Sequence, residues 1–252
     1  MKPQVVAHRG ASFEIAEHTL RAYVAALDLG AGGLECDVRL TLDGHLVCVH
    51  DRTLRRVGAS EKVVSTSTLA ELQELDVATW KNGDDAPKDG TLDGVLSLRT
   101  LLETVRDYDR RVDLAIETKH PTRYGGVVEH KLHAMLEEFG WHRKGAPVRV
   151  MSFNPTALLR MERLTPELTF VQLMDHNRNW QWLRPIVRPH WIIGPGIKTM
   201  RKHPRLAEKI TESGHDMHVW TVNTEEDLQV CLDAGVKAVI SDRPAMMLDL
   251  LA

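Results

Sequence analysis

The chain has 252 residues, 43% of them hydrophobic and 27% charged, which fits one large α/β domain spanning residues 1–252. Its 32 Lys and Arg residues nearly balance 35 Asp and Glu residues, for a formal net charge of -3 without the basic block typical of nucleic-acid binding. No apolar stretch approaches the roughly 18 residues of a membrane span, so we expect a small-molecule partner, no nucleic acid and no stable membrane insertion.

Short apolar segments alternate with amphipathic helical segments along the chain, which is typical of parallel βα units. Residues 20–27 carry an apolar stripe of helical spacing that ends at Gly30, while Asn154-Pro155 and Thr224 mark the starts of two later helices. Eight strands in this alternation predict a (β/α)8 barrel. The expected strands are residues 4–8, 33–38, 112–117, 148–152, 169–173, 191–194, 217–221 and 238–241.

One segment interrupts the alternation and predicts a hairpin. The residues on either side of Asp43-Gly44 have strand character, and this dipeptide is typical of a tight two-residue turn. Such a turn would place Asp37 directly opposite His50, on the same face of the hairpin. Glu35 shares that face because side chains alternate along a strand with a period of two.

Residues 51–95 predict a small insertion after this hairpin. The segment contains clusters of Gly, Pro, Asp and Ser and one expected helix, residues 68–75, that begins at a Thr-x-x-Glu capping box. It carries Trp80, but the polar run 81–85 leaves no membrane-binding stripe. We expect the insertion to cap the carboxyl ends of the strands, where such barrels hold their active sites.

The three cysteines, Cys36, Cys48 and Cys231, lie in apolar surroundings without C-x-x-C spacing. They indicate neither a disulfide framework nor a zinc site. The apolar start of the chain is too short for a signal-peptide core, so we expect a cytoplasmic protein with reduced core cysteines.

Charged motifs fall at the ends of expected strands, where the interior of a barrel would otherwise be apolar. Glu35, Asp37 and Glu117 supply hard oxygen donors, the ligands that Mg2+ or Ca2+ prefers, so the sequence predicts one such divalent cation. The four motifs are His8-Arg9-Gly10, Glu35-Cys36-Asp37, His50-Asp51 and Glu117-Thr118-Lys119.

The remaining groups in these motifs supply acid/base and phosphate-binding chemistry. His8 and His50 are the candidate acid/base pair, because imidazole titrates near neutrality. Arg9 and Lys119 are the candidate phosphate-binding cations. A divalent cation, two histidines and two such cations together can neutralise and cleave a phosphodiester.

In this order the four motifs resemble those of the glycerophosphodiester phosphodiesterase family. Residues 219–223 and 241–244 resemble the family's last two strand ends, so the resemblance covers nearly the whole chain. It implies that the substrate's glycerol hydroxyl attacks phosphorus and releases an alcohol, after which water opens the cyclic phosphate to give glycerol 3-phosphate. The implied roles are metal binding by Glu35, Asp37 and Glu117, acid/base catalysis by His8 and His50, and phosphate binding by Arg9 and Lys119.

One loop departs from the family pattern. Where the family usually reads Pro-Glu-Asn-Thr, this chain has His18 in place of the asparagine, which leaves the shape of the loop and the role of Glu17 open. Trp220 is expected either to line the substrate pocket or to pack at the top of the barrel.

Two alternatives to a soluble glycerophosphodiester substrate remain at this point. One is a lysophospholipase D-type phosphodiesterase that acts on lysophospholipids with the same catalytic groups. The other is a non-catalytic phosphodiester-binding protein that retains the barrel.

Overall fold

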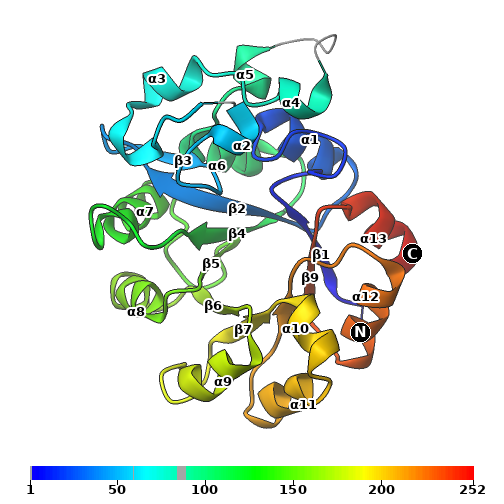
Figure 1. Cartoon of the computed structure of the whole chain (residues 1–252). Helices are drawn as coiled ribbons and strands as arrows, with labels where there is room; N and C mark the ends of the chain where they lie inside the picture. Colours follow the sequence, from blue (N-terminus) through cyan, green and yellow to red (C-terminus); the bar gives the residue numbers. More distant parts are fainter. Residues whose placement is uncertain (1, 59, 84–88) are drawn as a thin grey trace.

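The structure is a computed structural model that describes residues 2–58, 60–83 and 89–252, and its core is a barrel of eight parallel strands (Figure 1). The order of hydrogen-bonded strands is β7-β6-β5-β4-β2-β1-β9-β8, and bridges from Ile193 to Met217 and from Gly196 to Trp220 join β7 to β8. The predicted (β/α)8 barrel is therefore confirmed. The parallel strands are β1 (Gln4–His8), β2 (Gly33–Leu40), β4 (Asp113–Thr118), β5 (Val148–Ser152), β6 (Thr169–Met174), β7 (Ile192–Pro195), β8 (His218–Val219) and β9 (Ala238–Ser241).

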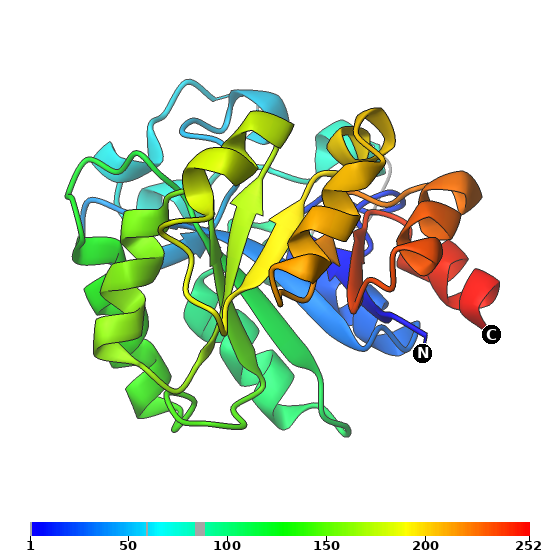
Figure 2. The ribbon, with the colours of Figure 1, turned by 90° about the horizontal axis from the view of Figure 1, so that it is seen from below.

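Helices flank the strands on both sides in the view from below (Figure 2). The side chains of Asn154 and Thr224 accept hydrogen bonds from backbone N–H groups at the starts of two helices, so these two predicted starts are confirmed, and Thr19 caps the first long helix in the same way. The main helices are α1 (Leu20–Asp28), α6 (Leu98–Asp107), α7 (Val127–Glu138), α8 (Pro155–Leu164), α9 (Asn177–Leu183), α10 (Ile197–Lys202), α11 (Arg205–Glu212), α12 (Glu225–Asp233) and α13 (Pro244–Leu251).

Side-chain alternation along the strands separates a helix-facing core from the barrel interior. On β2, Leu34 and Cys36 belong to the large cluster shared with the helices, which leaves Glu35 facing the interior. His8 is two residues after Val6, and Glu117 is two residues after Ala115. Because Val6 and Ala115 face the interior, His8 and Glu117 face it too. The interior apolar cluster is Val6, Ala115, Met151, Val171, Leu173, Ala238 and Ile240.

The hairpin formed by β2 and β3 (Leu46–Cys48) differs from the prediction by one residue in register. Val38 pairs with Cys48. Val49, and not His50, lies opposite Asp37, because its backbone N–H donates to the carbonyl oxygen of Asp37 at 3.0 Å. The predicted pairing of Asp37 with His50 is therefore wrong.

The turn explains the shift in register. The backbone N–H of Thr41 donates to the carbonyl oxygen of His45 at 2.9 Å, which leaves residues 42–44 as the loop. Gly44 has a φ of 84°, the left-handed conformation that closes a three-residue hairpin loop. The Asp-Gly signal therefore marks a turn, but one that is a residue longer than predicted.

The insertion holds several short helices rather than the single helix predicted. The capping box between Thr68 and Glu71 is present as expected. The segment packs on its own apolar cluster, which includes Val49, Leu54 and Leu72, so tertiary burial and not helical periodicity determines these short elements. They are α2 (Arg55–Gly58), the 3-10 helix η1 (Val64–Thr66), α3 (Leu69–Gln73), α4 (Thr79–Asn82) and α5 (Gly90–Asp93).

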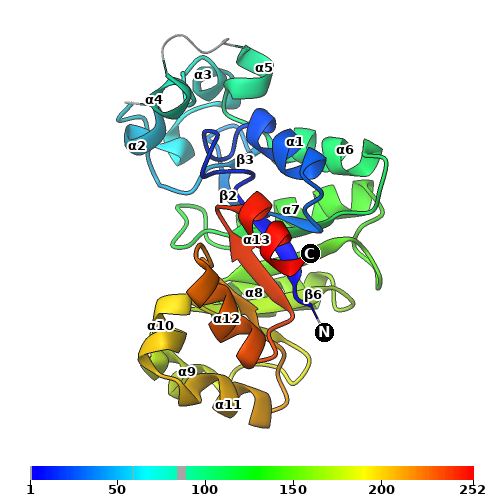
Figure 3. The ribbon, with the colours of Figure 1, turned by 90° about the vertical axis from the view of Figure 1, so that its right-hand side faces the viewer.

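The insertion contacts the loop between β1 and α1, at the carboxyl end of β1. Arg56 forms an ion pair with Glu17 at 2.7 Å, and the Lys81 ammonium donates to the carbonyl oxygen of Ser12. The side view shows the insertion at one end of the molecule and α9 to α12 at the other (Figure 3). Residues 84 and 85 of the predicted polar run lie outside the described residues.

The helices in the described part of the chain are all too short or too polar to cross a membrane.

Candidate active site

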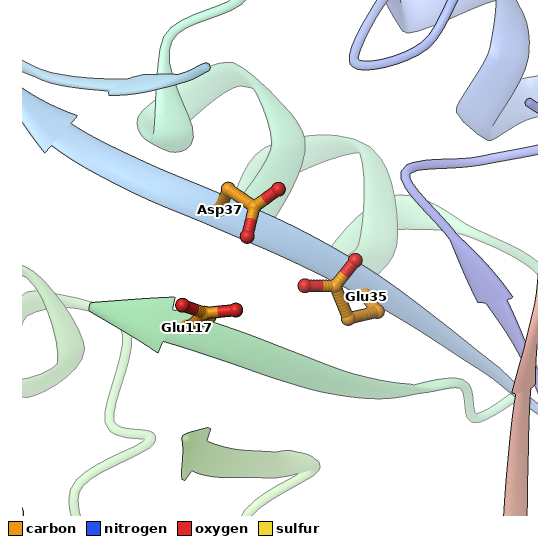
Figure 4. Close-up of side chains that lie close together, drawn as sticks. All are labelled: Glu35, Asp37 and Glu117. Atoms are coloured by element: carbon orange, nitrogen blue, oxygen red, sulfur yellow. The ribbon is translucent and has the colours of Figure 1, made fainter. Parts of the chain in front are cut away.

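Three carboxylates converge at the level where β1 and β4 end, near the middle of β2, which runs past its expected end at residue 38 to Leu40 and into the hairpin. Asp37 and Glu117 are register partners on these two adjacent parallel strands, and Glu35 precedes Asp37 by two residues on the same face. One oxygen from each carboxylate lies within 4.8 Å of the others, and all three side chains are buried. Figure 4 shows the carboxylates of Glu35, Asp37 and Glu117 turned toward one another.

Burial makes this arrangement costly without a counter-charge. Burial and the negative charge of Asp37 raise the pKa of Glu35 well above its ordinary value, and the same two causes raise the pKa of Glu117 to about 8. A divalent cation between the oxygens would offset this repulsion. The buried, oxygen-only donor set therefore fits a hard divalent cation such as Mg2+ or Ca2+.

Asp37 has more positive groups around it than Glu117, which is paired with Lys119 at 2.8 Å. Its Oδ1 lies 2.9 Å from the Lys119 ammonium, and its Oδ2 lies 2.9 Å from both Arg9 Nε and His18 Nε2. Burial raises the pKa of Asp37, but the charges of Arg9 and Lys119 outweigh it and hold the pKa well below its ordinary value. Asp37 is thus an ionised carboxylate held by ion pairs with Arg9 and Lys119 and by a hydrogen bond with His18.

His8 is oriented by a carboxylate from the far end of the chain. Its Nδ1 lies 2.6 Å from Oδ1 of Asp242, and its Nε2 lies 3.9 Å from Oε2 of Glu35. Ser12 and Asn223 donate hydrogen bonds to Asp242. Burial raises the pKa of Asp242, but its bond to His8 and those from Asn223 and Ser12 lower it to about 2. The ring of His8 therefore presents Nε2 to the carboxylate cluster.

His50 is held in a similar way, by the carboxylate of the next residue. Its Nδ1 lies 2.8 Å from Oδ1 of Asp51, which in turn accepts a bond from Arg56 at its other oxygen. Arg39 donates twice to the carbonyl oxygen of His50, at 2.9 and 2.8 Å. Burial, followed by the positive charge of Arg9, lowers the pKa of His50 to about 4. The ring is therefore uncharged at neutral pH.

The residues singled out from the sequence surround one cavity of about 200 Å³. Asp37 does not line this cavity itself, but it contacts Arg9 and Lys119, which do. Trp220 has both of its expected positions, because it lines the cavity while its Nε1 donates to the carbonyl oxygen of Gly194 at 2.8 Å. The predicted residues that line the cavity are His8, Arg9, Glu35, His50, Glu117, Lys119 and Trp220.

A family model described as the glycerophosphoryl diester phosphodiesterase family matches residues 8–246. The chain belongs to this family. Its curated relatives agree: a probable glycerophosphodiester phosphodiesterase 1 of Mycobacterium tuberculosis is 41% identical over 249 residues, covering 96% of this chain and 90% of the relative. A glycerophosphodiester phosphodiesterase of Bacillus subtilis is 32% identical over 244 residues, covering 95% of this chain and 83% of that protein. The chain is therefore a hydrolase by class, and the non-catalytic alternative is set aside.

Solved structures of similar fold include an Oleispira antarctica phosphodiesterase in complex with the product sn-glycerol 3-phosphate. That structure has a TM-score of 0.82 and 26% identity, and the alignment covers 99% of this chain and 96% of the other. A Silicibacter pomeroyi protein at 23% identity has a TM-score of 0.84, covers 99% of this chain and 92% of its own, and shares the fold.

The loop that departs from the family pattern accommodates its histidine. His18 has a φ of 60°, a left-handed conformation that Asn, Asp and His adopt more readily than other residues with a side chain. Its Nε2 contacts Asp37 at 2.9 Å and its Nδ1 contacts the hydroxyl of Tyr23 at 2.8 Å. His18 therefore connects α1 to the carboxylate cluster, and the adjacent Glu17 binds Arg9 at 2.9 Å.

Sequence reasoning gave no role to the residues that hold these side chains. Asp242 lies in the segment 241–244 and Asp51 in the His50-Asp51 motif, and the structure shows them as the partners of His8 and His50. Asp242 directly follows β9, and Asn223 lies shortly after β8. In this fold the active site lies at the carboxyl ends of the strands. That position is the signal that would have found them.

We predict that Asp242→Asn lowers kcat about 10- to 100-fold while leaving KM and metal affinity near their original values. The reason is that a neutral asparagine side chain could not supply the charged acceptor that orients His8 Nδ1. Steady-state kinetics and calorimetry on the same preparation measure these quantities. Asp249→Asn on the exposed face of α13 is the matched control. An unchanged kcat in Asp242→Asn would show that Asp242 does not position His8.

Proposed function

We propose that this family member hydrolyses glycerophosphodiesters to glycerol 3-phosphate and an alcohol, using one Mg2+ or Ca2+ ion. The observation that carries the proposal is the buried cluster of Glu35, Asp37 and Glu117, with two carboxylate-anchored imidazoles, His8 and His50, lining the same cavity. Nothing in a purely structural role requires three carboxylates to be buried together at the active-site face.

Glu35, Asp37 and Glu117 would hold the ion, since their oxygens are close enough to share one cation. When bound, a divalent cation withdraws electron density from phosphate oxygens and offsets the negative charge that develops there. Arg9 and Lys119 border the same cavity and add two positive charges that fix the phosphate. The anionic phosphodiester is thereby held between the metal ligands and the two rings.

The two histidines would move the protons. One ring accepts the proton of the substrate's glycerol hydroxyl as that oxygen attacks phosphorus, and the other donates a proton to the alcohol oxygen as its bond to phosphorus breaks. The resulting cyclic phosphate then reacts with water, with the proton transfers reversed, to give glycerol 3-phosphate. His50 is uncharged at neutral pH, which is the form a proton acceptor requires.

Product analysis on a defined substrate panel tests the proposal. Phosphorus NMR should show glycerol 3-phosphate formed from glycerophosphocholine and from glycerophosphoethanolamine, with choline or ethanolamine released in equal amount. Formation of glycerol and a phosphorylated alcohol would place the cleavage on the wrong side of phosphorus and contradict the mechanism.

Lysophospholipid hydrolysis is the second candidate, and one observation favours it. Phe13 and Trp80 are 48% and 47% exposed beside the active-site face, with the Lys81 ammonium over both rings. Phe13 is also bonded through its backbone N–H to the carbonyl oxygen of Asp242, next to His8. Including lysophosphatidylcholine in the panel separates the two candidates. Under our proposal, kcat/KM for lysophosphatidylcholine should be lower than kcat/KM for glycerophosphocholine.

A further inference from the structure

A second cavity opens beside the catalytic one and shares Lys119 with it. It measures about 360 Å³, against about 200 Å³ for the catalytic cavity. Its walls come from the hairpin and insertion on one side and from the segment after β4 on the other. Its described lining is Arg39, Leu40, Arg52, Val64, Ser65, Lys119, Pro121, Thr122, Arg123 and Tyr124, and we call it the cationic pocket.

The cationic pocket carries positive charge that no carboxylate of its described lining balances. Four of its lining residues are cations, of which Lys119 is paired with Asp37 and Glu117, at 2.9 and 2.8 Å, and the other three are arginines. Within the described parts of the chain, Arg39, Arg52 and Arg123 form no ion pair with an Asp or Glu side chain, whereas Arg9 and Arg56 each bind carboxylates. Arginines gathered in this way repel one another and attract an anion.

Two of the arginines, Arg39 and Arg123, are also held in place for binding. Arg39 is anchored by two bonds to the carbonyl oxygen of His50, so it joins the cationic pocket to the catalytic histidine. The hydroxyl of Tyr124 donates to the carbonyl oxygen of Ser65 at 2.9 Å, which ties the two walls together. Arg123 lies over the ring of Tyr124 at 5.7 Å from its centroid. Such fixed guanidinium groups suit the planar, two-point recognition of phosphate.

We propose that the cationic pocket binds an anionic phosphate group on the leaving alcohol, so that the enzyme prefers glycerophosphodiesters whose head group is itself phosphorylated. This inference rests on the proposed function. The glycerol part of the substrate carries no charge, so only the other substituent on phosphorus can bring a second anion. Lys119 lies in the walls of both cavities, so the two adjoin at this residue, and the head group would pass it to reach the cationic pocket.

A matched pair of substrates tests the inference. Glycerophosphoinositol and glycerophosphoinositol 4-phosphate differ by one phosphate on the head group, and both yield glycerol 3-phosphate in the same assay. We expect the wild-type kcat/KM to be at least about tenfold higher for the phosphorylated substrate, because a charge-assisted bond to phosphate contributes roughly that factor. The double variant R52Q/R123Q should lower this ratio about tenfold or more.

The control is Arg205→Gln, which removes one charge from the exposed start of α11, away from the cationic pocket, and should leave the ratio unchanged. Because the ratio compares two substrates on one preparation, a partly unfolded variant lowers both rates equally and leaves the ratio valid. Equal wild-type kcat/KM for the two substrates, or an unchanged ratio in R52Q/R123Q, overturns the inference while the proposed function stands. Failure to cleave these substrates and glycerophosphocholine alike overturns the proposed function itself.

Discussion

Glu35→Gln is expected to weaken Mg2+ or Ca2+ binding by roughly a hundredfold or more, since even residues that only support metal ligands contribute 10- to 100-fold. Glu35 is 1% exposed and faces the other two carboxylates. Its side chain accepts a bond from the backbone N–H of Arg9 but forms no ion pair with the Arg9 or Lys119 side chain, so the pairs around Asp37 survive the substitution. Calorimetric titration with each cation measures the loss.

The stability of the same variant gives a second, independent result. Burial and the charge of Asp37 raise the pKa of Glu35, so an uncharged amide at this position relieves repulsion in the metal-free protein. We expect the melting temperature of metal-free Glu35→Gln to equal or exceed that of the wild type. Glu212→Gln, at the exposed end of α11, is the matched control for both measurements. A metal affinity of Glu35→Gln equal to that of the wild type would show that Glu35 does not bind the metal.

His50→Ala is expected to reduce kcat by about 10²- to 10⁴-fold, the range for loss of a general acid or base. The fold should remain intact, because the His50 side chain is 35% exposed and Arg39 binds its backbone carbonyl, which alanine retains. Steady-state kinetics with glycerophosphocholine measures the effect, and circular dichroism checks the fold.

The substitution separates catalysis from metal binding. Calorimetry should give a cation affinity close to that of the wild type, since the candidate metal ligands are Glu35, Asp37 and Glu117 and do not include His50. His130→Ala, on the exposed surface of α7, should leave kcat unchanged. A kcat for His50→Ala within about threefold of the wild type would be inconsistent with general acid/base catalysis by this residue.

The parts of the site that follow from strand geometry were predictable from the sequence. Glu35 and Asp37 are two residues apart on β2, and Lys119, directly after β4, is two residues beyond Glu117 and still bonded through its backbone N–H to Val38, so each pair shares a face. Parallel strands then bring their carboxyl ends to one side of the barrel. Local spacing and the barrel prediction together were sufficient to gather these residues.

The hairpin register was not predictable from the Asp-Gly dipeptide alone. Both a two-residue turn and a three-residue turn accept glycine in the left-handed conformation, and only the pairing of Thr41 with His45 selects the longer loop. His50 nevertheless reaches the site, because it lies beyond the end of β3 and its position depends on Arg39 and Asp51 instead of the strand ladder.

The contacts that pair the candidate catalytic side chains with their partners were beyond local reasoning. Asp242 contacts His8 from 234 residues away in the chain, and Arg56 contacts Glu17 from 39 residues away. These contacts depend on barrel closure and on the docking of the insertion, which no single segment encodes. The short helices of the insertion were missed for the same reason, since shared burial around Leu54 and Leu72 stabilises them.

The most direct test of this account is glycerol 3-phosphate release from glycerophosphocholine by chelator-treated protein, before and after Mg2+ or Ca2+ is added back. We predict no measurable release without metal and full recovery with at least one of the two cations, half-maximal near the dissociation constant measured by calorimetry. Undiminished release by protein shown to be free of metal would contradict the central claim that Glu35, Asp37 and Glu117 act through a bound cation.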